Sequence, residues 1–326
     1  MVICVATNCQ KSQTKINGIS YVASPIKIDS THTKPIVNVN ANYASLMPFA
    51  FIRAIDSPKV YFSDKRQWFG ETEDGIVHYA QQLKQENIKI MLKPQIWVRR
   101  GEFTGLIQMN SENDWQTFEN EYKKFILTFV KVAEKQGIHI FCIGTELELF
   151  VKYRPDFWRQ LIKEIRTIYK GKLTYAANWD EFTRVPFWAD LDFIGVDAYF
   201  PLSDKKSPTL DEYKNGWQPH KKVLIEYHQK YQKPILFTEY GYRSVDFNGV
   251  KPWDVSDVNG NVNLQAQATA LEALYQEIWQ EPWFAGGFVW KWFVNHEEVG
   301  GAQNNRFTPQ NKPATQIIKK GYGKTY

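Results

Sequence analysis

The chain has 326 residues, 43% hydrophobic content and a formal net charge of +5, so it can bury one large core and a single domain is the default expectation. Its basic residues are scattered rather than massed, which disfavours a nucleic-acid or anionic-membrane partner. No apolar run reaches the roughly 18 residues of a membrane span, and the cysteines Cys4, Cys9 and Cys142 show neither zinc-site spacing nor a disulfide framework.

Two interpretations of residues 1–15 stay open. The first is a disordered tail, which leaves the protein cytoplasmic. The second is the remnant of a signal or lipoprotein segment with a lipid anchor at Cys9, which makes the protein an exported or cell-envelope lipoprotein. The segment lacks a basic start and a full apolar stretch, which counts against the second interpretation.

From residue 16 onward, short apolar runs alternate with longer amphipathic runs, as in a parallel sheet with crossover helices. The predicted strands cover residues 17–23, 43–51, 89–97, 139–144, 173–177, 193–198, 235–239 and 287–292. The predicted helices cover residues 72–87, 114–136, 155–169, 220–232 and 264–280. Pro35 weakens the first crossover, so we expect an irregular or very short helix over residues 31–42, and inserted loops over 204–216 and 245–262.

This order of elements predicts an α/β protein, a (β/α)₈ TIM barrel that forms one catalytic domain over residues 16–326. The alternative is a doubly wound sheet, which usually carries a Gly-rich phosphate turn after its first strand. Here that turn reads Ala23-Ser24-Pro25-Ile26, and no other phosphate loop is present. The closed barrel is therefore favoured, and a nucleotide-dependent enzyme is disfavoured.

In such a barrel the chemistry lies where the strands end. Polar or aromatic residues lie at or just after the ends of six neighbouring predicted strands: Lys93, Gln95, Trp97, Thr145, Glu146, Asn178, Trp179, Asp197, Tyr199, Thr238, Glu239, Trp290 and Trp292. Glu146 and Glu239 come directly after apolar runs, where a carboxylate is costly unless it is paired or used. A structural ion pair explains one such Glu as well as catalysis does, but two at one mouth favour catalysis.

Six segments spread over the chain resemble glycoside hydrolase family 113, the β-mannanase family of clan A. They are GISYVA (18–23), MLKPQIW (91–97), IGTEL (143–147), ANW (177–179), IGVDAY (194–199) and FTEYGY (237–242). The resemblance implies a metal-free and cofactor-free polysaccharide-degrading enzyme that cuts β-1,4-mannosidic bonds in mannan, glucomannan or manno-oligosaccharides with retention. Glu146 matches the acid/base and Glu239 the nucleophile, and Glu148 competes for the acid role.

One departure from clan A concerns the residue before the acid/base, which is Thr145 here instead of Asn. We expect Asn178 to supply the missing hydrogen bond to the sugar. Tyr199 is the first candidate to hold the nucleophile ionised, and Arg53 the second.

The substrate contacts that we expect are of two kinds. Trp290 is predicted to form the floor of the central subsite, with Trp97, Trp179 and Trp292 lining others. Lys93, Gln95 and Asn178 are predicted to contact sugar hydroxyls, although an ordinary rim salt bridge suits Lys93 equally well. Three alternatives remain, namely an exo-acting β-mannosidase, a hydrolase of another β-glycan and a noncatalytic glycan-binding barrel. We expect a monomer.

Overall fold

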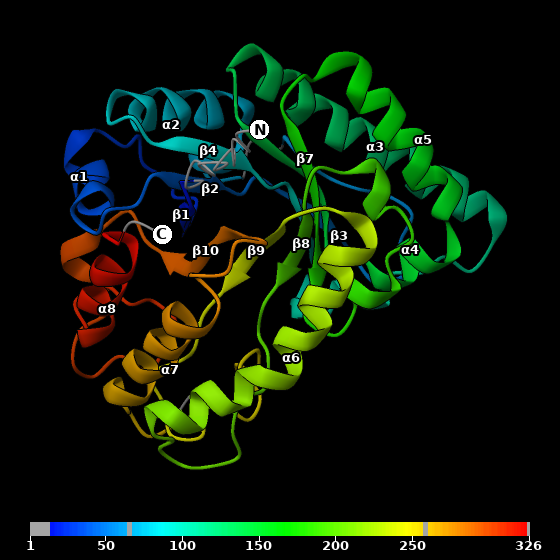
Figure 1. The fold of residues 1–326 in the computed structure, drawn as a ribbon. Coiled ribbons are helices and arrows are strands. Elements are labelled where there is room, and N and C mark those ends of the chain that lie inside the picture. The colour runs from blue at the N-terminus through cyan, green and yellow to red at the C-terminus, as the bar shows by residue number, and fades with distance from the viewer. Residues whose placement is uncertain (1–13, 64–66, 257–259, 325–326) are drawn as a thin grey trace, which may run out of the picture.

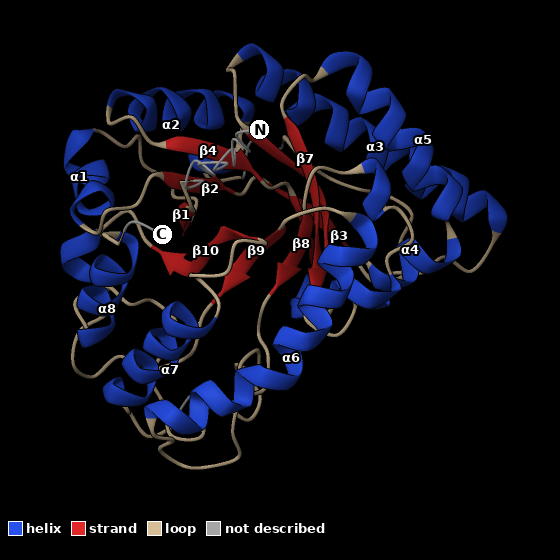
Figure 2. Cartoon of the chain, viewed as in Figure 1, coloured by secondary structure: helices blue, strands red, loops and turns tan. Residues whose placement is uncertain are grey.

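The computed structural model describes residues 14–63, 67–256 and 260–324. Eight parallel strands close into a barrel in the order β1-β10-β9-β8-β7-β6-β4-β2, and helices surround it (Figures 1 and 2). The predicted (β/α)₈ barrel is confirmed. Because all eight strands run in the same direction, their carboxyl ends meet at one rim.

The barrel strands are β1 (Ile16–Tyr21), β2 (Tyr43–Leu46), β4 (Lys89–Leu92), β6 (Ile140–Thr145), β7 (Lys172–Asn178), β8 (Ile194–Asp197), β9 (Ile235–Tyr240) and β10 (Phe284–Trp292). The α-helices are α1 (Ser30–Asn38), α2 (Glu73–Gln85), α3 (Glu112–Lys135), α4 (Glu148–Tyr153), α5 (Pro155–Ile168), α6 (Leu210–Tyr231), α7 (Leu264–Glu277) and α8 (Pro313–Tyr322). None of the helices in these described stretches is long and apolar enough to cross a bilayer.

Two predicted strands are each broken by a proline. Pro48 follows β2 and Pro94 follows β4, and beyond them β3 (Phe49–Ile52) pairs with β5 (Gln95–Val98) in a separate parallel ribbon. Proline has no backbone N–H for the ladder, so the sheet interrupts there. The ribbon continues past the barrel rim from barrel strands β2 and β4, and Lys93 lies at the break.

Three helical predictions need correction. Residues 30–38 form a regular helix despite Pro35, because Asp29 closes a capping box at its start. Helix α6 begins at Leu210, ten residues before its predicted start, because Thr209 and Glu212 form another capping box inside the segment that we expected to be a loop. Helix α8 was not predicted.

The tail boundary also shifts. Lys15 is buried, and its Nζ donates to the backbone oxygens of Glu281 at 2.7 Å and Phe284 at 2.5 Å. The ordered domain therefore includes Lys15. The remainder of the predicted tail up to residue 13, with Cys9, lies outside the described residues.

A small apolar cluster fills the barrel interior. Its members include Ile16, Met91, Ile140, Leu236 and Phe288, which come from five different strands. Three of them lie within the first two residues of their strands, so this packing closes the end of the barrel opposite the rim. Chemistry is thereby confined to the carboxyl ends of the strands.

Candidate active site

The carboxylate of Glu239 accepts hydrogen bonds on both of its oxygens. Tyr199 donates its hydroxyl to Oε2 at 2.7 Å, and Lys93 donates its Nζ to Oε1 at 2.5 Å. Gln95 adds a longer bond from Nε2 to Oε1 at 3.3 Å. Glu239 is therefore held by three hydrogen-bond donors, one of which is a cation.

Lys93 also binds a second carboxylate beneath the first. Its Nζ lies 3.1 Å from Oδ1 and 3.2 Å from Oδ2 of Asp197, and Thr238 donates to Oδ1 at 2.7 Å. Burial lowers the pKa of Lys93, but the charges of Asp197 and Glu239 outweigh it and leave the pKa above its ordinary value. Lys93 is therefore a buried cation shared by two carboxylates.

The pKa of Asp197 is likewise set by opposing influences. Burial and the negative charge of Glu239 raise the pKa of Asp197, while Lys93 and the Thr238 hydroxyl act in the opposite direction. Both of its oxygens accept from the Lys93 ammonium, which is the pattern of an ionised carboxylate. The predicted contact between Lys93 and sugar hydroxyls is wrong, because its amine is fully buried below Glu239.

Glu146 lies at the same rim, directly after β6, and its backbone adopts a left-handed conformation with φ of 49°. Burial raises the pKa of Glu146 well above the usual carboxyl value, and the negative charges of Asp197 and Glu239 raise it further. Glu146 is only partly exposed. The surroundings of Glu146 therefore favour the protonated form of its carboxyl group.

A relay of hydrogen bonds from β7 holds the backbone around Glu146. The Glu146 N–H donates to the Ala176 oxygen at 2.8 Å, and the Leu147 N–H donates to the Tyr175 hydroxyl at 2.7 Å. Tyr175 in turn donates to Oε1 of Glu181 at 2.7 Å. All three bonds come from or pass through buried groups, so this relay fixes the unusual backbone conformation.

Irregularities in strand pairing precede both glutamates. The β6–β7 register shifts between Cys142 and Thr145, and the β8–β9 register shifts between Val196 and Asp197, opposite Thr238. Such bulges redirect the side chains that follow them. The two carboxyl groups therefore leave the regular alternation of their strands at the rim.

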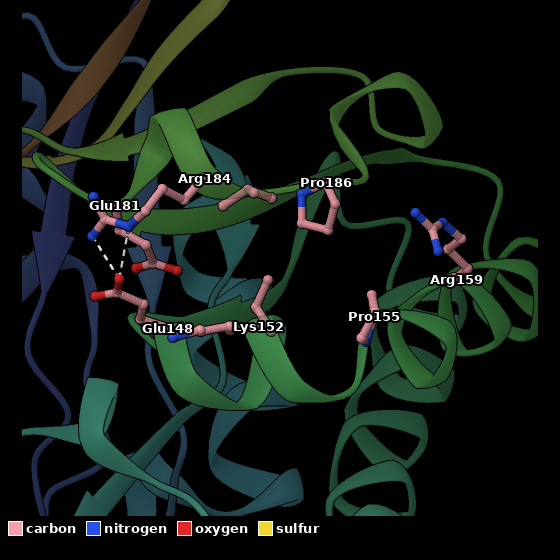
Figure 3. A pocket seen from close by; sticks show the side chains of 9 residues that line it. Glu148, Lys152, Pro155, Arg159, Glu181, Arg184 and Pro186 are labelled. Atoms are coloured by element: carbon pink, nitrogen blue, oxygen red, sulfur yellow. Dashed lines mark hydrogen bonds and ion pairs between the residues drawn. The ribbon is translucent and has the colours of Figure 1, made fainter.

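Glu148 lies apart from this arrangement. It opens α4 and pairs with Arg184, whose Nη2 lies 2.6 Å from its Oε1, as Figure 3 shows. The two line a separate pocket of about 350 Å³ that neither Glu146 nor Glu239 lines. The geometry therefore favours Glu146 over Glu148 as the partner of Glu239.

The predicted tryptophans fall into two groups. Trp290, two residues before the end of β10, and Trp179 are half-buried, and Trp97 is 51% exposed. Trp179 stacks on Trp253 with ring centroids 5.3 Å apart. Trp292 is different, because it is fully buried and stacks on His296 at 5.5 Å. Its predicted place in a subsite is wrong, since its ring packs within the protein.

Two other residues predicted to contact the substrate, Asn178 and Arg53, already interact with neighbouring groups of the protein. Asn178 accepts a hydrogen bond from the Trp179 N–H on Oδ1 at 2.8 Å, which leaves its amide nitrogen as the group that can donate. Arg53 is exposed, and its guanidinium lies over the Tyr61 ring at 5.6 Å. The hydrogen bonds described for Glu239 come from Lys93, Gln95 and Tyr199 and not from Arg53, so the expected role of Arg53 beside the nucleophile has no support.

Sequence reasoning placed Asp197 and Thr238 at strand ends but gave neither of them a role, and it did not single out Tyr175 or Glu181. Asp197 ends a buried apolar strand just as Glu146 follows one, so the signal was present. Tyr175 lies within a strand and Glu181 three residues beyond it, and nothing local marks either. No cluster of metal-ligating side chains occurs in the described part of the chain.

A closed (β/α)₈ barrel with two glutamates at its rim, Glu146 and Glu239, has the arrangement typical of a glycoside hydrolase. The chain belongs to Glycoside Hydrolase Family 113, whose profile matches residues 29–312. Among curated protein sequences there is no significant match.

Solved structures share the fold along nearly the whole chain. A family 113 β-mannanase from Alicyclobacillus acidocaldarius, solved in complex with ManMIm, is 24% identical, has a TM-score of 0.82 and aligns over 94% of this chain and 97% of its own. A family 113 β-1,4-mannanase solved as a complex is 23% identical, with a TM-score of 0.84 over 95% and 99% of the two chains. A β-glucuronidase from Faecalibacterium prausnitzii is 14% identical, with a TM-score of 0.64 over 96% of this chain and 50% of its own.

Proposed function

We propose that this protein hydrolyses β-1,4-mannosidic bonds in mannan, glucomannan or manno-oligosaccharides with retention of configuration. The observation that carries the proposal is the contrast between the two glutamates. Glu239 accepts from Lys93 and Tyr199, whereas burial and the nearby carboxylates raise the pKa of Glu146. This is the division of roles that double displacement needs.

In the first step, the ionised Glu239 attacks the anomeric carbon while Glu146 gives its proton to the departing glycosidic oxygen. The C–O bond to the leaving sugar breaks, and an ester between Glu239 and the remaining sugar forms. Tyr199 stays a hydrogen-bond donor throughout, because burial and the charge of Glu239 raise the pKa of its hydroxyl well above the usual value.

In the second step, Glu146 is a carboxylate and takes a proton from water. The resulting oxygen nucleophile attacks the anomeric carbon, and Glu239 departs as a carboxylate. Lys93 supports both steps, since its charge stabilises the free carboxylate in the resting enzyme and again after departure.

Two hollows at different parts of the rim support an endo mode of cleavage. One of about 720 Å³ lies by the β3–β5 ribbon. Another of about 470 Å³ is lined by Lys291, Phe293 and Phe307, and the Phe307 ring lies 5.8 Å from the Tyr199 ring. An exo enzyme requires a blind pocket, whereas a chain cut internally needs room on both sides of the cleavage point.

The test is release of reducing sugar from mannan, glucomannan, xylan and cellulose, with the anomer of the first product followed by proton NMR. We expect cleavage of mannan and glucomannan into a mixture of oligosaccharides. The anomer that forms first should be the β-anomer. Initial formation of the α-anomer would overturn retention. Release of mannose alone would indicate an exo enzyme, and cleavage confined to xylan or cellulose would overturn the substrate.

A further inference from the structure

We propose that the hollow beside the β3–β5 ribbon is a subsite for a sugar unit that carries a carboxylate, such as a hexuronic acid unit in or on the glycan. This inference rests on the proposed function. The hollow, here called the ribbon pocket, has a volume of about 720 Å³ and is lined by Arg53, Arg99, Arg100, Tyr61, Trp68 and Trp97, among others.

The ribbon connects this pocket to the candidate nucleophile. Residues two apart on a strand face the same side, and the ribbon's burial pattern alternates accordingly. On β5 this side carries Gln95, which donates to Glu239, and then Trp97. Arg99 directly follows the end of β5, opens a short 3₁₀ turn and lines the pocket together with Trp97. A glycan seated at Glu239 can therefore extend over Trp97 toward the pocket.

The paired strand β3 also leads from the catalytic mouth past an aromatic residue to an arginine. Phe49 lies opposite Gln95 in register, and Phe51 lies opposite Trp97. The next alternate position is Arg53, whose guanidinium is held over the Tyr61 ring. Both strands thus run from the catalytic mouth to an arginine.

The arginines of the ribbon pocket differ from four other arginines of the protein. Arg154, Arg159, Arg166 and Arg184 each form an ion pair with a carboxylate. Within the described residues, no carboxylate pairs with Arg53, Arg99 or Arg100, and all three are exposed. Three unpaired guanidinium groups around one hollow attract an anion, and the planar guanidinium matches a carboxylate with two parallel hydrogen bonds.

Among the residues that the structure describes, one carboxyl group also lines the pocket. Burial raises the pKa of Glu71, while hydrogen bonds from the Trp68 backbone and the Gln67 side chain oppose this rise. Its negative charge offsets at most one of the three arginines, so the pocket keeps a net positive charge.

The aromatic lining specifies a sugar rather than a small anion. Trp68 and Trp97 are each 51% exposed, and Tyr61 is 41% exposed. Large ring faces left open to solvent suit the C–H faces of a pyranose. A sugar acid uses both features, whereas a neutral sugar leaves the arginines without a charged partner and inorganic phosphate leaves the rings uncovered.

The experiment compares two probes, neutral mannopentaose and mannopentaose with one glucuronic acid branch placed on each unit in turn. We measure kcat/KM for the wild type and for the double variant Arg99→Gln/Arg100→Gln. In the wild type we expect a higher kcat/KM for at least one acidic probe. The acidic-to-neutral ratio should fall about tenfold or more in the double variant, and in the wild type it should fall with added salt.

The matched control is Arg159→Gln, an exposed arginine at the separate pocket of Glu148, which should leave the ratio unchanged. The inference would be overturned, while the proposed function stands, by either of two results. One is a ratio of kcat/KM for acidic over neutral probe of one or below at every branch position. The other is a ratio that the double variant does not change. If the wild type cleaves neither probe, the proposed function fails by itself. Calorimetric binding of both probes to the Glu239→Gln variant then decides. Tighter binding of the acidic probe, lost when Arg99 and Arg100 are also replaced, supports the subsite. Equal binding of the two probes overturns it.

Discussion

The Nζ of Lys93 lies 2.5 Å from Oε1 of Glu239, and the side chain of Lys93 is fully buried. The same ammonium binds Asp197 at 3.1 Å. One buried cation therefore sits between two carboxylates, and its charge balances a site that would otherwise gather negative charge from Asp197, Glu239 and the ionised form of Glu146.

Replacing Lys93 with Met should damage both stability and activity. The two carboxylates lose their cation inside the protein, so the free energy of unfolding should fall by about 3–5 kcal/mol. The kcat/KM for mannan should also fall, since Glu239 loses its cationic hydrogen-bond donor. Urea unfolding and steady-state kinetics measure the two effects. The control is Lys123→Met, whose exposed pair with Glu164 at 3.6 Å should contribute less than about 1 kcal/mol. A Lys93 variant indistinguishable from that control would contradict the assignment.

Glu146→Ala should separate substrates by leaving group. Cleavage of mannan should drop by about 10²–10⁴, because proton donation to the glycosidic oxygen is lost. Aryl mannosides with good leaving groups should still form the intermediate, and azide should restore turnover by giving a β-mannosyl azide. Glu239→Ala should abolish cleavage of both substrates. Glu148→Ala, which removes the partner of Arg184, serves as the matched control, and an azide-rescued phenotype in that variant would reassign the acid role.

The raised pKa of Glu146 also predicts a pH dependence of stability. Between the ordinary carboxyl pKa and the raised native value, the native state holds a proton that the unfolded state has released, so stability falls as pH rises through this window. Glu146→Gln cannot ionise and should escape this loss. Its free energy of unfolding relative to the wild type should increase from pH 4 to pH 7. A constant difference across that range would show that Glu146 titrates normally.

Tyr175→Phe tests the relay behind the acid/base. The change removes the hydroxyl that accepts from Leu147 and donates to Glu181, so Glu146 should lose its fixed position. We expect kcat to fall about tenfold with little change in KM. The free energy of unfolding should fall by about 1–3 kcal/mol. Tyr169→Phe removes another buried hydroxyl, which donates to Ile138 at 2.8 Å. It should lower stability by a similar amount without changing kcat, and equal kcat losses in both variants would argue against positioning.

Trp290 and Trp292 should respond in opposite ways to replacement by Ala. Trp290 is half-buried at the rim, so its loss should raise KM for manno-oligosaccharides with little effect on unfolding. Trp292 is fully buried, so its loss should destabilise the protein by about 3–5 kcal/mol. Steady-state kinetics and urea unfolding of the two variants distinguish these roles. A larger stability loss in the Trp290 variant would reverse the assignment.

Local sequence patterns were sufficient to predict the barrel and the two glutamates. Alternation of apolar strands with amphipathic helices is a property of neighbouring residues, and it predicted the strand order around the site. Glu146 and Glu239 were visible because each directly follows an apolar run. The same reasoning failed where a local pattern was ambiguous, as for α6, whose start depends on the capping box at Thr209.

The contacts between residues on different strands of the barrel were decided only by the tertiary structure. Lys93 reaches both Asp197 and Glu239 because β4 ends at a proline break and because β8 and β9 are adjacent in the closed barrel. Trp290 and Trp292 are two residues apart on one strand, yet one reaches the rim and the other is buried. Burial and contacts with residues far away in the sequence set the surroundings of each glutamate. These quantities depend on chain closure and strand register, which no short stretch of sequence contains.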